Sequence, residues 1–172
     1  MKILLEGRPG SGKTTVAWRL LEILRADGVA VRGFVTREIR ERGMRVGFSF
    51  ETADGTTGTL AHVDFSGPPR VGKYGVDLEE FERVVVPVVS PAGAGEVVLM
   101  DELGKMELAS KSFRDAALSV FEDDAVVVVA TVHSFRHPVT DALKRRHDID
   151  LIAVTRRNRD ELPEAIAGRL RG

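Results

Sequence analysis

The chain contains no cysteine and no glutamine, and Asn158 is its only asparagine. The absence of cysteine excludes disulfide bonds, thiolate metal sites and cysteine catalysis. Charged residues make up 30% of the sequence, and a chain with few labile side chains and many charges is typical of thermophile proteins. A biased genome produces the same composition, so both explanations stay open.

Long hydrophobic runs are also absent. No stretch approaches the roughly 20 apolar residues that cross a bilayer, and no signal peptide precedes the first motif, so we expect a cytoplasmic protein without a membrane partner. The 25 basic and 26 acidic residues give a net charge of −1, which provides no general attraction to nucleic acid or membranes. With 43% hydrophobic residues, we expect a single domain over residues 1–172.

The first informative motif is GRPGSGKT at residues 7–14. It lies between an apolar stretch and an amphipathic one, so it fits the phosphate-binding pattern GxxxxGK(S/T) between a strand and a helix. Glycines allow backbone angles that turn successive N–H groups toward phosphate oxygens at the start of the helix. The motif predicts nucleotide binding by Gly7, Arg8, Pro9, Gly10, Ser11, Gly12, Lys13, Thr14 and Thr15.

Two side chains of this loop carry specific chemistry. Lys13 supplies a positive charge to the β and γ phosphates of a nucleoside triphosphate, and the hydroxyl of Thr14 is a ligand for Mg²⁺. The expected partners are therefore ATP, GTP and other nucleoside triphosphates, with Mg²⁺ as the cofactor.

Short β-branched runs alternate with helical patterns, which predicts an α/β fold of the P-loop NTPase type with a mostly parallel, doubly wound sheet. We expect strands at 2–6, 29–36, 97–101, 126–131 and 151–155, and helices at 13–26, 78–89, 110–122, 138–146 and 160–170. Residues 37–76 interrupt this rhythm, because alternating side chains and glycine turns favour an inserted antiparallel ribbon. Pro87 and Pro91 mark the end of a helix.

A second motif, VVLMDELGKMEL, occupies residues 97–108. Four apolar residues lead into Asp101 and Glu102, so a buried strand delivers two carboxylates to the edge of the sheet where ligands bind. Asp101 is the predicted carboxylate at the Mg²⁺ site, and Glu102 the predicted residue that polarises the attacking water. A Ras-type glutamine cannot take that role in a chain without glutamine. The alternative is that both acids only begin a solvated loop.

A carboxylate directly after the Mg²⁺ aspartate indicates the P-loop branch in which one strand separates the two motif strands. The run at 125–131 is the candidate for that strand. It ends at Thr131 and is followed by His133, which we predict to contact the γ-phosphate or the attacking water. His133 can equally be a capping or packing group.

Taken together, these segments resemble the cancer-related nucleoside-triphosphatase family, small P-loop NTPases of thermophilic bacteria, archaea and vertebrates. The resemblance covers nearly the whole chain and rests on GRPGSGKTT, RGFVTREIRERGMRVGF at 32–48, VGKYGVDLEEFE at 71–82, DELGKMEL at 101–108, ATVH at 130–133 and TRRNRDELP at 155–163. It implies a RecA-like or nucleotide-kinase-like sheet and Mg²⁺-dependent hydrolysis of nucleoside triphosphates with broad base tolerance. Leu103 departs conservatively from the expected isoleucine.

The sequence has no signature for reading one particular base. Guanine-specific G proteins use an AsnLysXaaAsp loop, whereas Asn158 lies in ThrArgArgAsnArg. This segment follows the strand at 151–155, so Arg156 and Asn158, with Arg159, are predicted to border the base or the ribose. The alternative is that Asn158 and Asp160 cap the last helix.

Charge that develops on the γ-phosphoryl group requires a further cation. Arg37, directly after the strand at 29–36, is the first candidate. Other arginines, which surface ion pairs explain equally well, are Arg32, Arg40, Arg42 and Arg45. Without a positioned arginine, turnover is slow, because an arginine finger contributes roughly 10³ to 10⁵ in rate. Lys105 and Glu107 either position substrate or belong to an ordinary loop.

The predicted reaction is in-line hydrolysis of the bond between the β and γ phosphates. Two other interpretations stay open: a kinase for a nucleotide, a nucleic-acid end or a small molecule, and an NTPase switch regulated by RNA or a protein. Basic clusters at 144–147 and 156–159 motivate the switch, but the near-zero net charge and 6% aromatic residues do not favour nucleic acid. No motif specifies the oligomeric state, and we expect a monomer.

Overall fold

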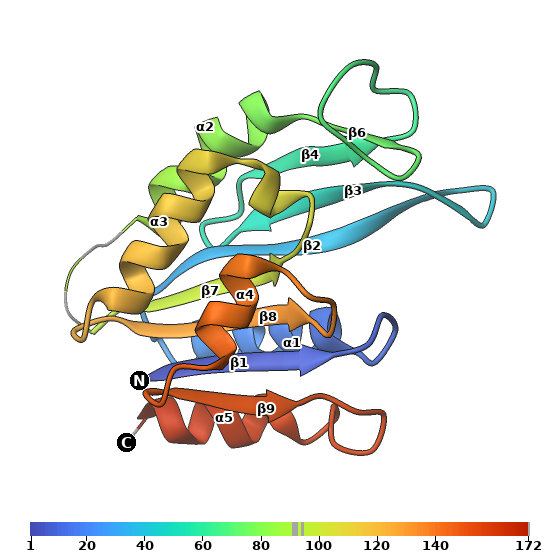
Figure 1. The fold of residues 1–172 in the computed structure, drawn as a ribbon. Coiled ribbons are helices and arrows are strands. Elements are labelled where there is room, and N and C mark those ends of the chain that lie inside the picture. Colours follow the sequence, from blue (N-terminus) through green and yellow to red (C-terminus); the bar gives the residue numbers. More distant parts are fainter. Residues whose placement is uncertain (91–92, 94, 172) are drawn as a thin grey trace.

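The computed structural model describes residues 1–90, 93 and 95–171, and within them the chain forms one nine-stranded sheet with helices on both faces (Figure 1). The parallel part has the order β2-β7-β8-β1-β9. Its strands are β1 (Lys2–Gly7), β2 (Val31–Glu41), β7 (Val97–Leu103), β8 (Val127–His133) and β9 (Ile149–Ala153). The predicted doubly wound α/β class is confirmed, and β8 separates β1 from β7 as the second motif indicated.

Antiparallel strands extend the sheet beyond β2. They are β3 (Met44–Thr52), β4 (Thr57–His62), β5 (Arg70–Val71) and β6 (Tyr74–Val76). The parallel pairing of β2 with β7 ends at Phe34, whereas its antiparallel pairing with β3 continues to Glu41. Strand β2 therefore runs past Thr36, where the sequence predicted its end, and Arg37 lies inside the strand instead of after it.

Helices α2 (Leu78–Val89), α3 (Lys111–Glu122) and α4 (Pro138–Lys144) contribute to the core on one face of the sheet, and α1 (Lys13–Ala26) and α5 (Leu162–Arg171) to the core on the other. Helix α3 begins one residue later than predicted, because Ser110 is its N-cap and accepts a hydrogen bond from the N–H of Phe113 at 2.9 Å. Pro87 lies in the last turn of α2, and Pro91 lies outside the described residues.

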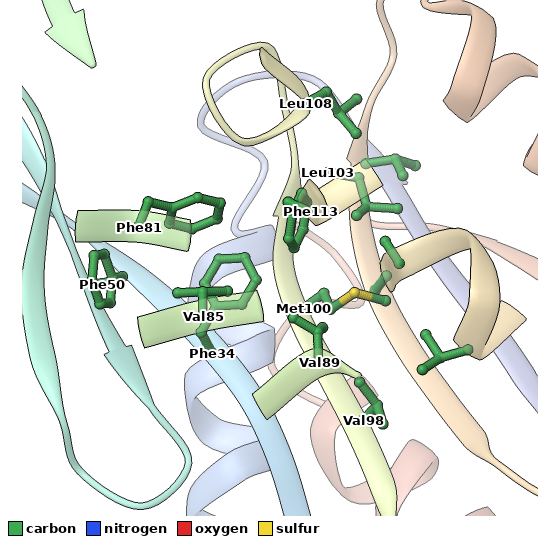
Figure 2. Close-up of a cluster of buried hydrophobic side chains, with 14 of the residues drawn as sticks. Phe34, Phe50, Phe81, Val85, Val89, Val98, Met100, Leu103, Leu108 and Phe113 are labelled. Carbon is green, nitrogen blue, oxygen red and sulfur yellow. The ribbon is translucent and has the colours of Figure 1, made fainter. Parts of the chain in front are cut away.

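Four phenylalanines join the antiparallel strands to the rest of the fold (Figure 2). Phe81 of α2 packs edge-on against Phe34 of β2, Phe50 of β3 and Phe113 of α3, with ring centroids 5.2–5.8 Å apart. All four are at most 1% exposed. Each such ring contributes about 1.5–3 kcal/mol by burial, and edge-to-face pairs add about 0.5–1.5 kcal/mol. The core thus holds β2 and β3 firmly against the parallel strands.

The parallel strands direct their C-terminal ends to one edge of the sheet, on the right in Figure 1. Register confirms this, because Gly7 at the end of β1 pairs with His133 at the end of β8, and Leu103 at the end of β7 pairs with Val132. The phosphate loop, the paired acids and His133 therefore meet at the same edge. In the described ranges, no helix has the length and apolar character needed to cross a membrane.

Candidate active site

The phosphate loop connects β1 to α1 with backbone angles that favour glycine. Gly10 and Gly12 have φ values of 76° and 108°, which residues with a Cβ rarely adopt. Gly12 is the N-cap of α1 and has no side chain with which to cap the helix, so in the described part of the chain the first N–H groups of the helix are available to bind an anion. Within the described chain, the Oγ atom of Ser11 is buried without a hydrogen-bond partner, as expected of a group that binds a ligand.

Lys13 lies between this loop and the acids of β7. Its side chain is only 6% exposed, and its Nζ atom donates a hydrogen bond to the carbonyl of Gly7 at 3.0 Å. The same Nζ atom is 3.7 Å from Oε2 of Glu102. The first helical residue and the end of a strand nearly ninety positions later thus share one charge pair, which ties the two motifs together.

Asp101 is fully buried and accepts hydrogen bonds from three other elements. Its Oδ1 atom accepts from the hydroxyls of Thr14 at 3.2 Å and Thr131 at 2.6 Å, and its Oδ2 atom accepts from the hydroxyl of Thr36 at 3.0 Å. Burial, and then the charge of Glu102, raises the pKa of Asp101, while the hydroxyl hydrogen bonds oppose this shift. A cation beside this carboxylate would favour its charged form.

Thr36 is a contact that the sequence did not identify. Its backbone N–H also donates to Asp101, at 3.3 Å. The sequence could have indicated Thr36 through its position, because it was the expected last residue of a strand and the C-terminal ends of the parallel strands meet at this edge.

Glu102 lies beside Asp101 but reaches the open cavity. Its Oε1 atom is 2.5 Å from Nε2 of His133, and the two side chains are 20% and 24% exposed. Among the described residues, Nδ1 of His133 is buried and has no hydrogen-bond partner. The imidazole therefore holds one carboxylate oxygen, while the other faces Lys13.

Glu107 is a third carboxyl group at this place, after Asp101 and Glu102. It is 5% exposed, and burial, followed by the charge of Glu102, raises the pKa of Glu107 well above its ordinary value of 4.5. A Cβ atom on Gly104 would come within 2.7 Å of Oε2 of Glu107 and 3.2 Å of Nε2 of His133. The glycine thus lets the loop after β7 bring three titratable side chains close together.

A cavity of about 680 Å³ connects these groups. Its wall includes Lys13, Thr14, Thr36, Glu102, Glu107 and His133, and also Arg37 from β2. The guanidinium of Arg37 lies 3.5 Å above the ring of Trp18, whose Nε1 atom donates to the carbonyl of Thr36 at 2.9 Å. The predicted candidate arginine is therefore held at the cavity.

The segment after β9 contributes Arg159 to the cavity wall. A Cβ atom on Gly12 would meet Cδ of Arg159 at 2.6 Å, so this arginine lies across the phosphate loop. Among the described residues that line the cavity, Arg156 and Asn158 are not found. The Asn158 side chain closes its own loop, because it accepts from the N–H of Thr155 at 2.8 Å and donates to the carbonyl of Ala153 at 2.8 Å.

The oxygen atoms of Thr14 and Asp101 fit a hard divalent cation. Across the described ranges, no group of three or more His, Cys, Asp and Glu side chains could hold a metal ion. Mg²⁺ commonly binds through one or two protein oxygens together with waters and substrate phosphates. The residues therefore fit Mg²⁺ that arrives with a nucleotide better than a metal held by the protein alone.

A phosphate loop after β1, a buried aspartate in β7 and a single strand between them define this protein as a P-loop NTPase. The chain belongs to the NTPase family, whose model matches residues 2–167. The nucleoside-triphosphatase THEP1 of Methanosarcina acetivorans is 43% identical over 171 residues, which cover 98% of this chain and 96% of that protein.

Two solved structures have the same fold. The crystal structure of THEP1 from the hyperthermophile Aquifex aeolicus has a TM-score of 0.89 and 35% identity, with 100% of both chains covered. The solution structure of a human cancer-related nucleoside triphosphatase has a TM-score of 0.82 and 35% identity, and covers 98% of this chain and 96% of that chain. The family resemblance and the fold type predicted from the sequence are both confirmed.

Proposed function

We propose that this protein hydrolyses nucleoside triphosphates to diphosphate and phosphate in an Mg²⁺-dependent reaction with broad tolerance for the base. The observation that carries this proposal is the 3.7 Å approach of Lys13 to Glu102, because it brings the phosphate loop and the acids of β7 to one point. The names of the relatives, which are nucleoside-triphosphatases, support the same reaction.

Thr14 and Asp101 would hold Mg²⁺ together with the phosphates of the nucleotide. Their oxygen atoms lie 3.2 Å apart, and the hydroxyls of Thr36 and Thr131 keep the carboxylate in place. When bound, the ion neutralises negative charge on the β and γ phosphate oxygens. Asp101 itself is too buried to contact bulk water, so its role would be to hold and orient the metal ion.

Glu102 orients the attacking water and accepts its proton. The carboxylate is partly exposed to the cavity and lies next to Lys13, which binds the γ-phosphate. His133 fixes the carboxylate through its 2.5 Å contact. General base catalysis of this kind contributes roughly 10² to 10⁴ in rate.

Arg37 supplies positive charge near the γ-phosphoryl group. Its guanidinium is stacked on Trp18 and lines the cavity beside Thr36. A cation already in position stabilises the charge that develops in the transition state without needing to be reorganised.

Broad base tolerance is supported by the segment after β9. The side chain of Asn158, the only asparagine of the chain, is engaged in its own loop, and the long side chain of Arg159 lies across the phosphate loop. Arg156 and Asn158 are absent from the described wall of the cavity, and we keep them as predicted neighbours of the base or ribose that do not select one base.

Regulation by nucleic acid is less favoured than simple hydrolysis. In the basic cluster at 144–147, Lys144 pairs with Glu6 at 2.5 Å and donates to the carbonyl of His133 at 2.7 Å. Arg146 pairs with Asp148 at 2.7 Å. These cations are engaged within the fold, so the cluster is not a row of free charges for a phosphate backbone.

Phosphate release from ATP, GTP, CTP and UTP, each with Mg²⁺ or with a chelator, tests the proposal. We expect release from all four with Mg²⁺, rates that differ by less than about tenfold between bases, and loss of activity with chelator. An absence of phosphate release from every triphosphate in the presence of Mg²⁺ would overturn the proposed function.

A further inference from the structure

The cavity continues past the carboxylates, away from the phosphate loop. Arg45 and Phe48 of β3 and Tyr74 of β6 line it together with Glu102. In the sheet, β3 is four strand spacings from β1 and two from β7, or about 19 Å and 10 Å at the usual separation. These side chains therefore form a wall on the far side of Glu102 from the loop, which we call the outer wall. Hydrolysis of a triphosphate does not require it.

Arg45 supplies the positive charge of the outer wall. Its Nε atom donates to the hydroxyl of Tyr74 at 3.0 Å, and an Nη atom donates to Oε1 of Glu38 at 3.0 Å. The guanidinium also lies 5.1 Å from the ring centre of Phe48 and 5.9 Å from that of Tyr74. Although the side chain is 45% exposed, its plane is held from several sides. A fixed guanidinium plane is a stacking surface for a nucleobase.

The cavity wall also carries an exposed aromatic ring, which follows β8 on the phosphate-loop side of β7. Phe135 follows β8, is 49% exposed, and lies with Nζ of Lys105 5.5 Å from its ring centre. Over the whole cavity wall cations outnumber acids, because Lys13, Arg37, Arg45, Lys105 and Arg159 line it with Glu38, Glu102 and Glu107. Flat rings and guanidinium planes combined with excess positive charge suit a ligand that has both a base and a phosphate.

We propose that the outer wall is an acceptor subsite for a nucleoside monophosphate, with the base against Arg45 and Phe48 and the phosphate toward Arg37 and Lys105. The inference rests on the proposed function, because it requires a triphosphate in the phosphate loop. A cavity of about 680 Å³ fits small ligands better than a polymer.

The acceptor would replace water in the transfer. An oxygen of the monophosphate forms a bond to the γ-phosphorus, the bond from that phosphorus to the β–γ bridging oxygen breaks, and its electron pair stays with the departing diphosphate. The products are two nucleoside diphosphates. A doubly ionised acceptor phosphate has no proton to lose, so this step needs no general base, in contrast to the attack of water.

Binding can be followed through Trp18, the only tryptophan of the chain, because it stacks on Arg37. Protein saturated with Mg²⁺ and a non-hydrolysable ATP analogue is titrated with AMP, with adenosine and inorganic phosphate as partial probes. We expect saturable AMP binding that does not displace the analogue. AMP that binds only by displacing the analogue, or that does not bind, would overturn the proposal.

Substitutions in the outer wall test whether its residues bind AMP. Arg45→Ala and Arg45→Lys should each weaken AMP binding by at least about tenfold, since lysine keeps the charge but loses the plane. Phosphate release without AMP should stay within about twofold, which also shows that the variants fold. Arg83→Ala, on the surface of α2, is the matched control. Equal AMP affinity in the wild type and both Arg45 variants would contradict the assigned wall.

The transfer itself is tested with ATP labelled in the γ-phosphate. Label that enters ADP formed from AMP, and that decreases in Arg45→Ala, would support the acceptor role. Label found only in free phosphate at saturating AMP would refute that role and leave hydrolysis intact. Failure of the proposed function has a different signature, because phosphate release would then be absent even without AMP.

Discussion

The two ends of the cavity are built in different ways. The end at the phosphate loop consists of buried polar groups at the C-terminal ends of adjacent parallel strands and at the start of α1, with Asp101 fully buried and Lys13 6% exposed. The outer wall comes from antiparallel strands and combines the buried ring of Tyr74 with the more exposed side chains of Arg45 and Phe48. The first end is arranged for chemistry on a phosphate. The outer wall offers a surface that can bind different ligands without changing the groups at the first end.

The largest expected effect is at the phosphate loop. Lys13→Ala removes the cation that bridges the loop and Glu102, so kcat/KM for ATP hydrolysis should fall by roughly 10³-fold or more. Triphosphate affinity should fall as well, because the charge is present in the ground state. Lys111→Ala, an exposed lysine of α3, is the control. A Lys13→Ala protein with more than a tenth of normal activity would remove the phosphate loop from the mechanism.

Arg37 comes next, because it lies between the two ends. Arg37→Ala should lower kcat by about 10²-fold and change KM little, since its charge acts mainly on the transition state. Arg83→Ala should behave like the wild type. If KM rises and kcat is unchanged, Arg37 binds substrate and does not stabilise the transition state.

The sequence alone predicts the phosphate-loop end of the cavity but not its outer wall. Gly7 to Thr15, Asp101 and Glu102 were predictable, because a local motif and a buried strand determine where they lie. Outer-wall side chains such as Phe48 and Tyr74 were not, since their meeting depends on pairing of β3 with β4 and of β4 with β6 across a long loop. Periodicity indicates a strand but does not specify its partner or register.

The ends of helices and strands were likewise predictable only where local sequence determines them. Helix α1 was predicted at its observed bounds, because the glycine-rich loop marks its start and AspGly follows its end. Strand β9 lies two residues earlier than predicted, at Ile149–Ala153, since its pairing with β1 sets the register. The segment from Thr155 to Arg159 is therefore a loop of its own, which is why Asn158 closes that loop.

A smaller effect concerns pH and the stability of the nucleotide-free protein. Because burial raises the pKa of Glu107 well above 4.5, the folded state binds more protons than the unfolded state between the two pKa values. The contribution of Glu107 to the free energy of unfolding is therefore fully present below about pH 4.5. It is lost as the pH rises through the pKa that Glu107 has in the folded state. Urea unfolding of Glu107→Gln should show a weaker decline with rising pH than the wild type.

The matched control for this comparison is Glu22→Gln, at an exposed position of α1. It should keep the pH dependence of the wild type. The free energy of unfolding could instead change with pH in the same way for all three proteins between about pH 5 and 8. That result would mean that Glu107 does not ionise in this range, or that burial does not raise its pKa.

The smallest effect is expected at the outer wall without an acceptor. Phe48→Leu keeps apolar volume but loses the ring, so ATP hydrolysis should stay within about twofold of the wild type. Steady-state phosphate release is the measurement. A loss of tenfold or more in a stably folded variant would show that the two ends of the cavity are not separable.

The convergence of the loop and the strand acids is tested most directly by single-turnover phosphate release from Glu102→Gln, with ATP affinity measured on the same protein. Glutamine keeps the shape but cannot accept the proton of the attacking water, so release should slow by about 10² to 10⁴-fold while ATP affinity stays within a few-fold. Glu41→Gln, an exposed glutamate of β2, should match the wild type. Release at the normal rate from Glu102→Gln would contradict the proposed placement of the water beside Glu102.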